Sequence, residues 1–236
     1  MSAWVETSIF EMIRCAPSNH IWVKSSTIAS LLHFNDNYKK LIDSGINDLQ
    51  VSADGATKET VEKIRPGPQF EPVTSNRKLL NECCKQEGVL KTRMWIVLQR
   101  DNLSELFDLV KVAHELKFKR MTFALSLTEW GQDRWAAVDR SVAAEDSITP
   151  DMAQKAIEVE NKLGVEVSFR ENADKHSTRS LKTLCGWPFE RSFVSSDMRV
   201  VPCCMSATPE LSDVGDAHDF TEVWKGESYR GVRRAH

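Results

Sequence analysis

No stretch of the 236-residue sequence approaches the roughly 20 consecutive apolar residues that a membrane-spanning helix needs. A basic excess is also lacking, since 31 lysines and arginines stand against 34 acidic residues, and this argues against nucleic acid as a partner. The first residues show no basic region followed by an apolar core, so we expect no secretory signal and a cytoplasmic protein with no membrane partner. In a reducing cytosol the six cysteines favour thiolate–metal chemistry over disulfides.

Strand-like and helix-like segments alternate along most of the chain. Their periods predict helices over 4–14, 38–45, 70–84, 102–116 and 149–164, and strands over 20–24, 49–54, 94–98, 121–127 and 165–169. Repeated β-then-α units predict an α/β fold with parallel strands and helices outside them. Residues 128–148 break the rhythm and are expected to form a loop insertion. From residue 172 onward the pattern becomes short and irregular, so we place a domain boundary between 171 and 172.

Several residues mark the ends and the buried faces of these helices. Asn102 is expected to cap the helix that follows it, with Glu105 at the third position. Gly164 is expected to end the helix that opens at 149–151. Cys83 and Cys84 continue an apolar helical stripe, which favours core packing over a reactive pair of thiols.

Polar side chains follow one predicted strand at its carboxyl end. Ser52 and Asp54 close the strand over 49–54 and Gly55 follows them. Ligands bind at this edge of parallel sheets, where Ser52 offers a hydroxyl group and Arg65 offers a planar fork that suits a carboxylate. The alternative is an ordinary strand end followed by an Asp-Gly turn.

Three cysteines bracket a short aromatic and β-rich stretch near the C-terminus: Cys185, Cys203 and Cys204. Soft thiolates that turns bring together ligate iron–sulfur clusters or zinc. The alternative is ordinary buried cysteine. Trp187 and Trp224 are expected to build a small core around this site.

Three segments in order resemble one family, the radical S-adenosylmethionine (SAM) enzymes. Residues 49–56 with 63–65 resemble the fourth-strand segment of these enzymes, and residues 96–106 resemble their fifth strand and the helix after it. Residues 185–189, 201–204 and 220–233 resemble the SPASM or shorter twitch domain, which holds an auxiliary cluster in many of them.

The resemblance implies a partial, TIM-like parallel β/α barrel over residues 1–171, lacking its first strands, and a small iron–sulfur domain over 172–236. The barrel would hold SAM at the carboxyl ends of its strands, and the small domain would hold an auxiliary 4Fe–4S cluster. The residues that the resemblance assigns to SAM are Ser52, Asp54, Arg65 and Asn102. Those that it assigns to the cluster are Cys185, Cys203 and Cys204.

The sequence departs from the family at two places. The Cys-x3-Cys-x2-Cys loop, whose cluster cleaves SAM, is absent, and Cys15 stands alone. We therefore expect either an N-terminally incomplete sequence or a descendant without this cluster. A 4Fe–4S cluster usually takes four thiolates, and the tail offers three. His218 or Cys15 would complete the set, or one iron would stay open to a substrate; a zinc site with His218 is a further alternative.

The resemblance implies radical-based modification of a peptide or protein as the parent activity, with a reductant protein as a second partner if the chain is active. The alternative is a non-catalytic iron–sulfur or zinc-binding module on a degenerate barrel. An ordinary β/α enzyme with unrelated chemistry would contain no iron.

Overall fold

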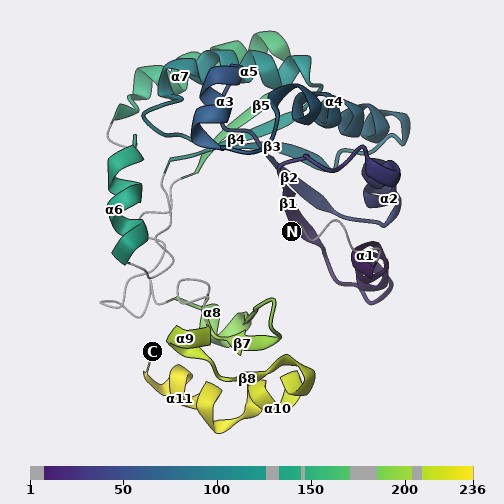
Figure 1. Cartoon of the computed structure of the whole chain (residues 1–236), viewed down its shortest axis with the longest axis vertical. Coiled ribbons are helices and arrows are strands. Elements are labelled where there is room, and N and C mark those ends of the chain that lie inside the picture. Colours follow the sequence, from purple (N-terminus) through teal and green to yellow (C-terminus); the bar gives the residue numbers. More distant parts are fainter. Residues whose placement is uncertain (1–7, 126–132, 145–146, 171–184, 204–208, 236) are drawn as a thin grey trace. The chain divides into compact units, whose positions relative to one another are not determined.

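The computed structural model describes residues 8–125, 133–144, 147–170, 185–203 and 209–235 (Figure 1). The chain divides into two compact units: residues 1–126 with 142–171 form the first, and residues 127–141 with 172–236 form the second. No helix in the described part of the chain is long and apolar enough to cross a membrane.

The first unit contains a parallel sheet whose strands follow one another in chain order (Figure 1). These strands are β1 (Lys24–Thr27), β2 (Asp48–Ser52), β3 (Thr92–Val97), β4 (Arg120–Ala124) and β5 (Glu166–Arg170). The helices are α1 (Ser8–Ser18), α2 (Asn37–Asp43), α3 (Lys58–Ile64), α4 (Phe70–Gln86), α5 (Leu106–Glu115) and α7 (Pro150–Leu163). Consecutive parallel strands joined by helices form the predicted α/β architecture of a partial β/α barrel.

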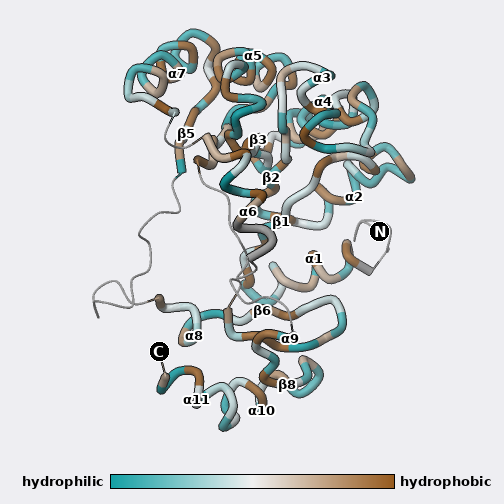
Figure 2. Tube along the Cα trace, turned by 60° about the vertical axis from the view of Figure 1, so that its left-hand side comes forward, coloured by the Kyte–Doolittle hydropathy of each residue, from teal (hydrophilic) through white to brown (hydrophobic). Residues whose placement is uncertain are grey.

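The core lies between the sheet and these helices. The strand residues that face the helices are 0% exposed: Leu49, Val51, Met94, Ile96, Met121 and Phe123. Side chains on the opposite face are mostly polar and half-buried, including Gln50, Ser52 and Arg93. Trp95 and Val97, which lie on this opposite face of β3, are half-buried as well. Figure 2 shows hydrophobic and hydrophilic residues alternating along α4, α5 and α7, as one-sided packing requires.

The local signals at α7 and α4 are confirmed. The Thr149 hydroxyl accepts a hydrogen bond from the backbone N–H of Met152 at 3.3 Å, and Gly164 ends α7 with a φ of 67°. Cys83 and Cys84 are buried in the core. Burial, reinforced by Cys83, raises the pKa of the Cys84 thiol to about 11, so both residues serve packing, as predicted.

Two sequence predictions of local structure are wrong. The strand expected over 20–24 begins at Lys24, because residues 16–21 close the end of α1: the His20 N–H donates to the Pro17 oxygen, and His20 has a φ of 59°. The loop expected over 128–148 contains α6 (Asp133–Val142), whose alanine and arginine residues favour a helix. The rest of that segment lies partly outside the described residues.

The second unit contains a small antiparallel sheet in the order β6 (Phe193–Val194), β7 (Arg199–Val201), β8 (Gly215–Asp216). This unit also contains most of α6, and its later helices are α8 (Trp187–Glu190), α9 (Pro209–Ser212), α10 (Phe220–Lys225) and α11 (Glu227–Ala235). Gly215 has a φ of 150°, and a Cβ there would meet Val223 Cγ2 at 2.5 Å, so this close packing of β8 against α10 requires glycine.

Candidate functional site

The carboxyl end of β2 carries the first predicted site. Ser52 is the last residue of β2, and its half-buried side chain lies on the face of the sheet opposite the helices. Its backbone oxygen accepts a hydrogen bond of 2.7 Å from Arg77 Nη2. The sheet therefore presents the Ser52 hydroxyl on its polar face, at the edge where parallel sheets bind ligands.

Asp54 and Arg65, both predicted site residues, are brought together as a forked ion pair. Arg65 Nε lies 2.5 Å from Asp54 Oδ2, and Nη2 lies 3.2 Å from Oδ1. The Asp54 side chain is 6% exposed and the Arg65 side chain is 40% exposed. Bidentate pairs of this kind are among the stronger charged contacts. The carboxylate is thus enclosed, while part of the guanidinium remains accessible.

Asn102 occupies the predicted N-cap position, before the turn Leu103–Glu105 that leads into α5, but its side chain makes no capping hydrogen bond. Its Nδ2 donates to the backbone oxygens of Asp54 at 2.9 Å and Val97 at 3.0 Å, and its Oδ1 accepts from the Gln99 N–H at 2.8 Å. The residue is 0% exposed. These bonds satisfy the amide better than a cap would, and they tie the loop after β2 to the end of β3.

Glu105 binds the loop that follows β2 and the start of α3, a role that the sequence did not reveal. Its carboxylate accepts hydrogen bonds of 2.7 Å from the Ala56 N–H and from the hydroxyls of Thr57 and Thr60. Burial opposes ionisation of Glu105, but the bonds from Thr60, Ala56 and Thr57 outweigh it and lower its pKa. Gly55 allows this close packing, because a Cβ there would meet Thr60 Cγ2 at 2.7 Å.

Arg77 is the second residue that the sequence reasoning missed. It is 3% exposed, and burial lowers its pKa to about 10, although Asp54 raises it. The residue lies on the same side of α4 as Val73 and Leu80, so an arginine within an apolar stripe was the signal available in the sequence.

The polar face of the sheet has a tryptophan at its centre. Trp95 is paired in register with Ser52 on one side and with Thr122 on the other. The Arg170 guanidinium lies 5.7 Å from its ring centroid and Lys24 Nζ lies 6.0 Å from it. An aromatic ring beside two cations can bind an apolar or an anionic group.

The cysteines of the second unit are partly described. Cys185 directly precedes α8 and its Gly186 cap, and Cys203 follows β7; both are half-buried. Cys204 lies outside the described residues. Among the residues that are described, no group of three or more His, Cys, Asp or Glu side chains could hold a metal ion, so the structure does not gather His218 with Cys185 and Cys203.

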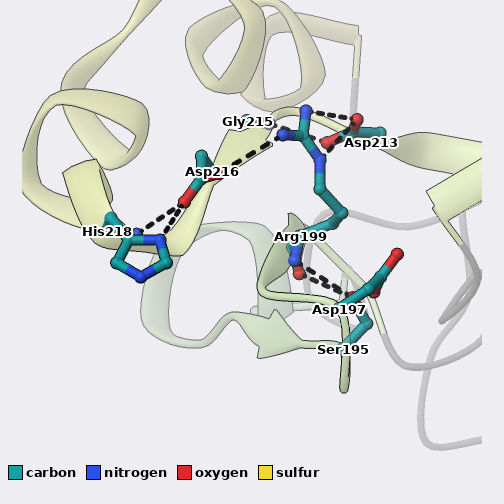
Figure 3. Close-up of polar contacts among 7 residues, drawn as sticks. All are labelled: Ser195, Asp197, Arg199, Asp213, Gly215, Asp216 and His218. Atoms are coloured by element: carbon teal, nitrogen blue, oxygen red, sulfur yellow. Dashed lines mark hydrogen bonds and ion pairs between the residues drawn. The ribbon is translucent and has the colours of Figure 1, made fainter.

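His218 belongs instead to a network of charged side chains (Figure 3). The Asp216 carboxylate contacts His218 Nδ1 at 2.7 Å, and Arg199 lies between Asp213, at 2.6 Å, and Asp216, at 3.7 Å. The backbone N–H and then the imidazole of His218 lower the pKa of Asp216. The network joins β7 to β8 at the surface.

Trp224 forms part of a small cluster of side chains with Arg233 and Tyr229. The Arg233 guanidinium lies 4.2 Å from the Trp224 ring and 4.4 Å from the Tyr229 ring, and Arg233 Nε donates to the Pro188 oxygen at 2.8 Å. Burial, and to a smaller extent the charge of Cys203, raises the pKa of Tyr229. The Arg191 guanidinium lies 5.2 Å from the centroid of the Trp187 ring.

These features define a parallel β/α sheet with a polar edge, followed by a small cysteine-bearing unit. Residues 185–236 match the family model of the SPASM domain, an iron–sulfur cluster-binding domain. The chain is similar in fold to SuiB of Streptococcus suis bound to its precursor peptide SuiA, with a TM-score of 0.70 at 14% identity over 96% of this chain and 53% of that one. It is also similar to SuiB bound to S-adenosylmethionine, with a TM-score of 0.67 at 15% identity over 96% and 53% of the two chains.

A further structure with this fold is native anSMEcpe with bound AdoMet, with a TM-score of 0.59 at 16% identity over 96% of this chain and 64% of that one. No curated protein sequence matches the chain. The chain spans between about half and two thirds of the length of these solved structures. It therefore carries a SPASM domain and has the fold of radical SAM enzymes, as the sequence resemblance implied.

Proposed function

We propose that the carboxyl end of β2, where Ser52, Asp54 and Arg65 form what we call the polar edge, binds SAM. We further propose that the second unit binds an auxiliary 4Fe–4S cluster, within an enzyme that modifies a peptide or protein by radical chemistry. The SPASM match over residues 185–236 carries this proposal. The solved structures of similar fold support the ligands, since one contains S-adenosylmethionine and another a precursor peptide.

The donor set at the polar edge fits SAM. The Ser52 hydroxyl and the accessible part of the Arg65 fork suit a ribose and a carboxylate, respectively. Asp54 and Asn102 act by holding this edge in place, since both are buried and hydrogen-bonded. When it is cleaved beside a reduced cluster, SAM supplies a radical that abstracts hydrogen.

The donor chemistry of the second unit fits an iron–sulfur cluster. Cys185 and Cys203 are half-buried thiols, and Cys204 adds a third donor next to Cys203 in the sequence. Thiolates are the usual ligands of such clusters. The zinc and open-iron alternatives remain distinct outcomes of the test below.

A second candidate function is a non-catalytic iron–sulfur or zinc-binding module. The absence of Cys-x3-Cys-x2-Cys from the 236 residues favours it, because these residues then hold no cluster of the kind that cleaves SAM. The two candidates differ in SAM binding and share a cysteine-held metal.

The test is anaerobic purification followed by iron, sulfide and zinc assays and SAM calorimetry. Cys185→Ser, Cys203→Ser and Cys204→Ser should each abolish most of the bound iron, whereas Cys83→Ala in the core of the first unit should retain it. Cys15→Ser and His218→Ala identify a fourth ligand by loss of iron. Absence of metal from the native protein would contradict both candidates. Iron without SAM binding would favour the module.

A further inference from the structure

Asp54 lies near two guanidinium groups. Arg65 is bound to it through a forked ion pair, and Arg77 Nη2 lies 2.7 Å from the backbone oxygen of Ser52, two residues before Asp54. The described residues give Asp54 no ion pair other than that with Arg65. One carboxylate thus faces two cations, which leaves a local excess of one positive charge.

Arg77 is an unusual residue for its position. It is 3% exposed, Nη2 donates to the Ser52 oxygen at 2.7 Å, and its buried Nε has no hydrogen-bond partner among the described residues. A buried charge is costly unless a counter-charge compensates it, and methionine or leucine would fill the stripe of α4 at lower cost. Packing alone therefore does not explain why this position carries a charged side chain.

If a ligand binds at the carboxyl end of β2 and engages Arg65, Asp54 needs a second cation to compensate its charge. If Arg65 turns toward the anionic group of a ligand, Asp54 loses its ion-pair partner while it remains enclosed, with its backbone oxygen held by Asn102 at 2.9 Å. An uncompensated buried carboxylate would oppose that movement. We infer that Arg77 is a positioning residue, a second counter-charge for Asp54 that allows Arg65 to engage the ligand's carboxylate. The identity of the ligand rests on the proposed function.

A thermodynamic cycle without ligand tests the counter-charge. Arg65→Gln and Arg77→Met are combined, and unfolding is measured by chemical denaturation. Each single variant leaves Asp54 one cation, whereas the double variant leaves none. We expect the double variant to unfold about tenfold more readily than the product of the single effects, as coupled neighbours do. Asp54→Asn should remove this excess, and Arg77→Lys in place of methionine should also remove it. Additive effects would overturn the inference.

Ligand binding gives a second readout that a purely structural role would not change. S-adenosylhomocysteine carries the carboxylate, whereas 5′-methylthioadenosine lacks the amino-acid portion. Arg77→Met should weaken the first about tenfold and leave the second unchanged, because Asp54 then retains Arg65. Equal weakening of both would contradict the inference. Should Arg77→Met not fold, Arg77→Gln replaces it in both experiments. If the native chain binds neither nucleoside, the proposed function fails, and the cycle above still decides the role of Arg77.

Discussion

The two units are stabilised by different means. In the first unit a sheet and its helices enclose a continuous core, with aliphatic and aromatic side chains at 0% exposure on three central strands. In the described part of the second unit, the large apolar side chains at 0% exposure are Val200, Val201 and Tyr229. The second unit instead contains arginines that bind carboxylates, backbone oxygens and aromatic rings.

This difference indicates which unit depends on a cofactor. Small domains that bury little apolar surface usually need a metal or another crosslink to fold, and the free energy of metal binding then contributes directly to folding. On the proposal above, the cysteines of the second unit provide that crosslink, while the first unit folds on its own core.

The largest expected effect is the loss of the second unit when iron is removed. Chelation under oxidising conditions should destabilise that unit by on the order of several kcal/mol, because its core cannot replace the metal. Limited proteolysis with mass spectrometry should then show cleavage throughout 185–235 while β1 to β5 stay protected. Equal protection of both units before and after chelation would contradict the inference that only the second unit depends on a metal.

Removal of a core side chain should have the next largest effect, and in the first unit only. Phe123 is 0% exposed and stacks on Phe169 at 5.3 Å between centroids. Phe123→Ala should destabilise the first unit by about 3–5 kcal/mol, as for other buried phenylalanines. Phe220→Ala, at a position that is 39% exposed in the second unit, should cost less than about 1 kcal/mol. Hydrogen exchange resolves the two units, and similar losses would contradict the different stabilisation inferred here.

Loss of the Arg233 side chain should destabilise the second unit, as loss of a core side chain destabilises the first. Arg233 donates to the oxygens of Pro188 and Trp224 at 2.8 and 2.9 Å and packs on two rings. Arg233→Gln should cost about 2 kcal/mol, because it leaves both oxygens without this donor. Arg234→Gln is the matched control: its ion pair with Glu227 is exposed to solvent, so the change should leave the stability nearly unaltered. Equal effects in urea denaturation would show that the arginine cluster does not stabilise this unit.

The elements that follow a local rule could be predicted from the sequence. Residues 49–53 alternate between apolar and polar, and Thr149 with Gly164 bounds α7, so pattern and capping determine both elements. The helix α6 and the turn at His20 were missed. Helix propensity prevailed in the first, and the hydrogen bonds that close α1 prevailed in the second.

The sequence predicted the side chains of the candidate site that a ligand could reach. It did not predict the contacts of the residues that hold those side chains in place. Ser52 closes a strand, which is a position visible in the sequence, and Arg65, which ends α3, was assigned through the family resemblance. Asn102, Glu105 and Arg77 contact partners between 25 and 49 residues away in the sequence. Only the folded sheet creates those contacts. An arginine within the apolar stripe of α4 marked Arg77 as unusual, but it did not indicate which partner Arg77 contacts.

The smallest loss of stability is expected at the carboxyl end of β2. There polar contacts stabilise the first unit, as they do the second unit. Glu105→Gln removes the charge that accepts three hydrogen bonds, and it should cost about 1 kcal/mol at pH 7, since the partly exposed site screens part of the gain. Glu115→Gln, at the exposed end of α5, the helix that follows Glu105, should change stability by only a few tenths of a kcal/mol.

The pH dependence identifies the cause of that loss. The folded chain lowers the pKa of Glu105 below its usual 4.5, so the stabilisation is present above about pH 4.5 and is lost as the pH falls through the lower, folded value. The difference between native protein and Glu105→Gln should therefore be constant from pH 7 to 5 and shrink on further acidification. A difference independent of pH down to 3 would assign the loss to altered packing, and the polar edge would then be stabilised in the same way as the core beneath it.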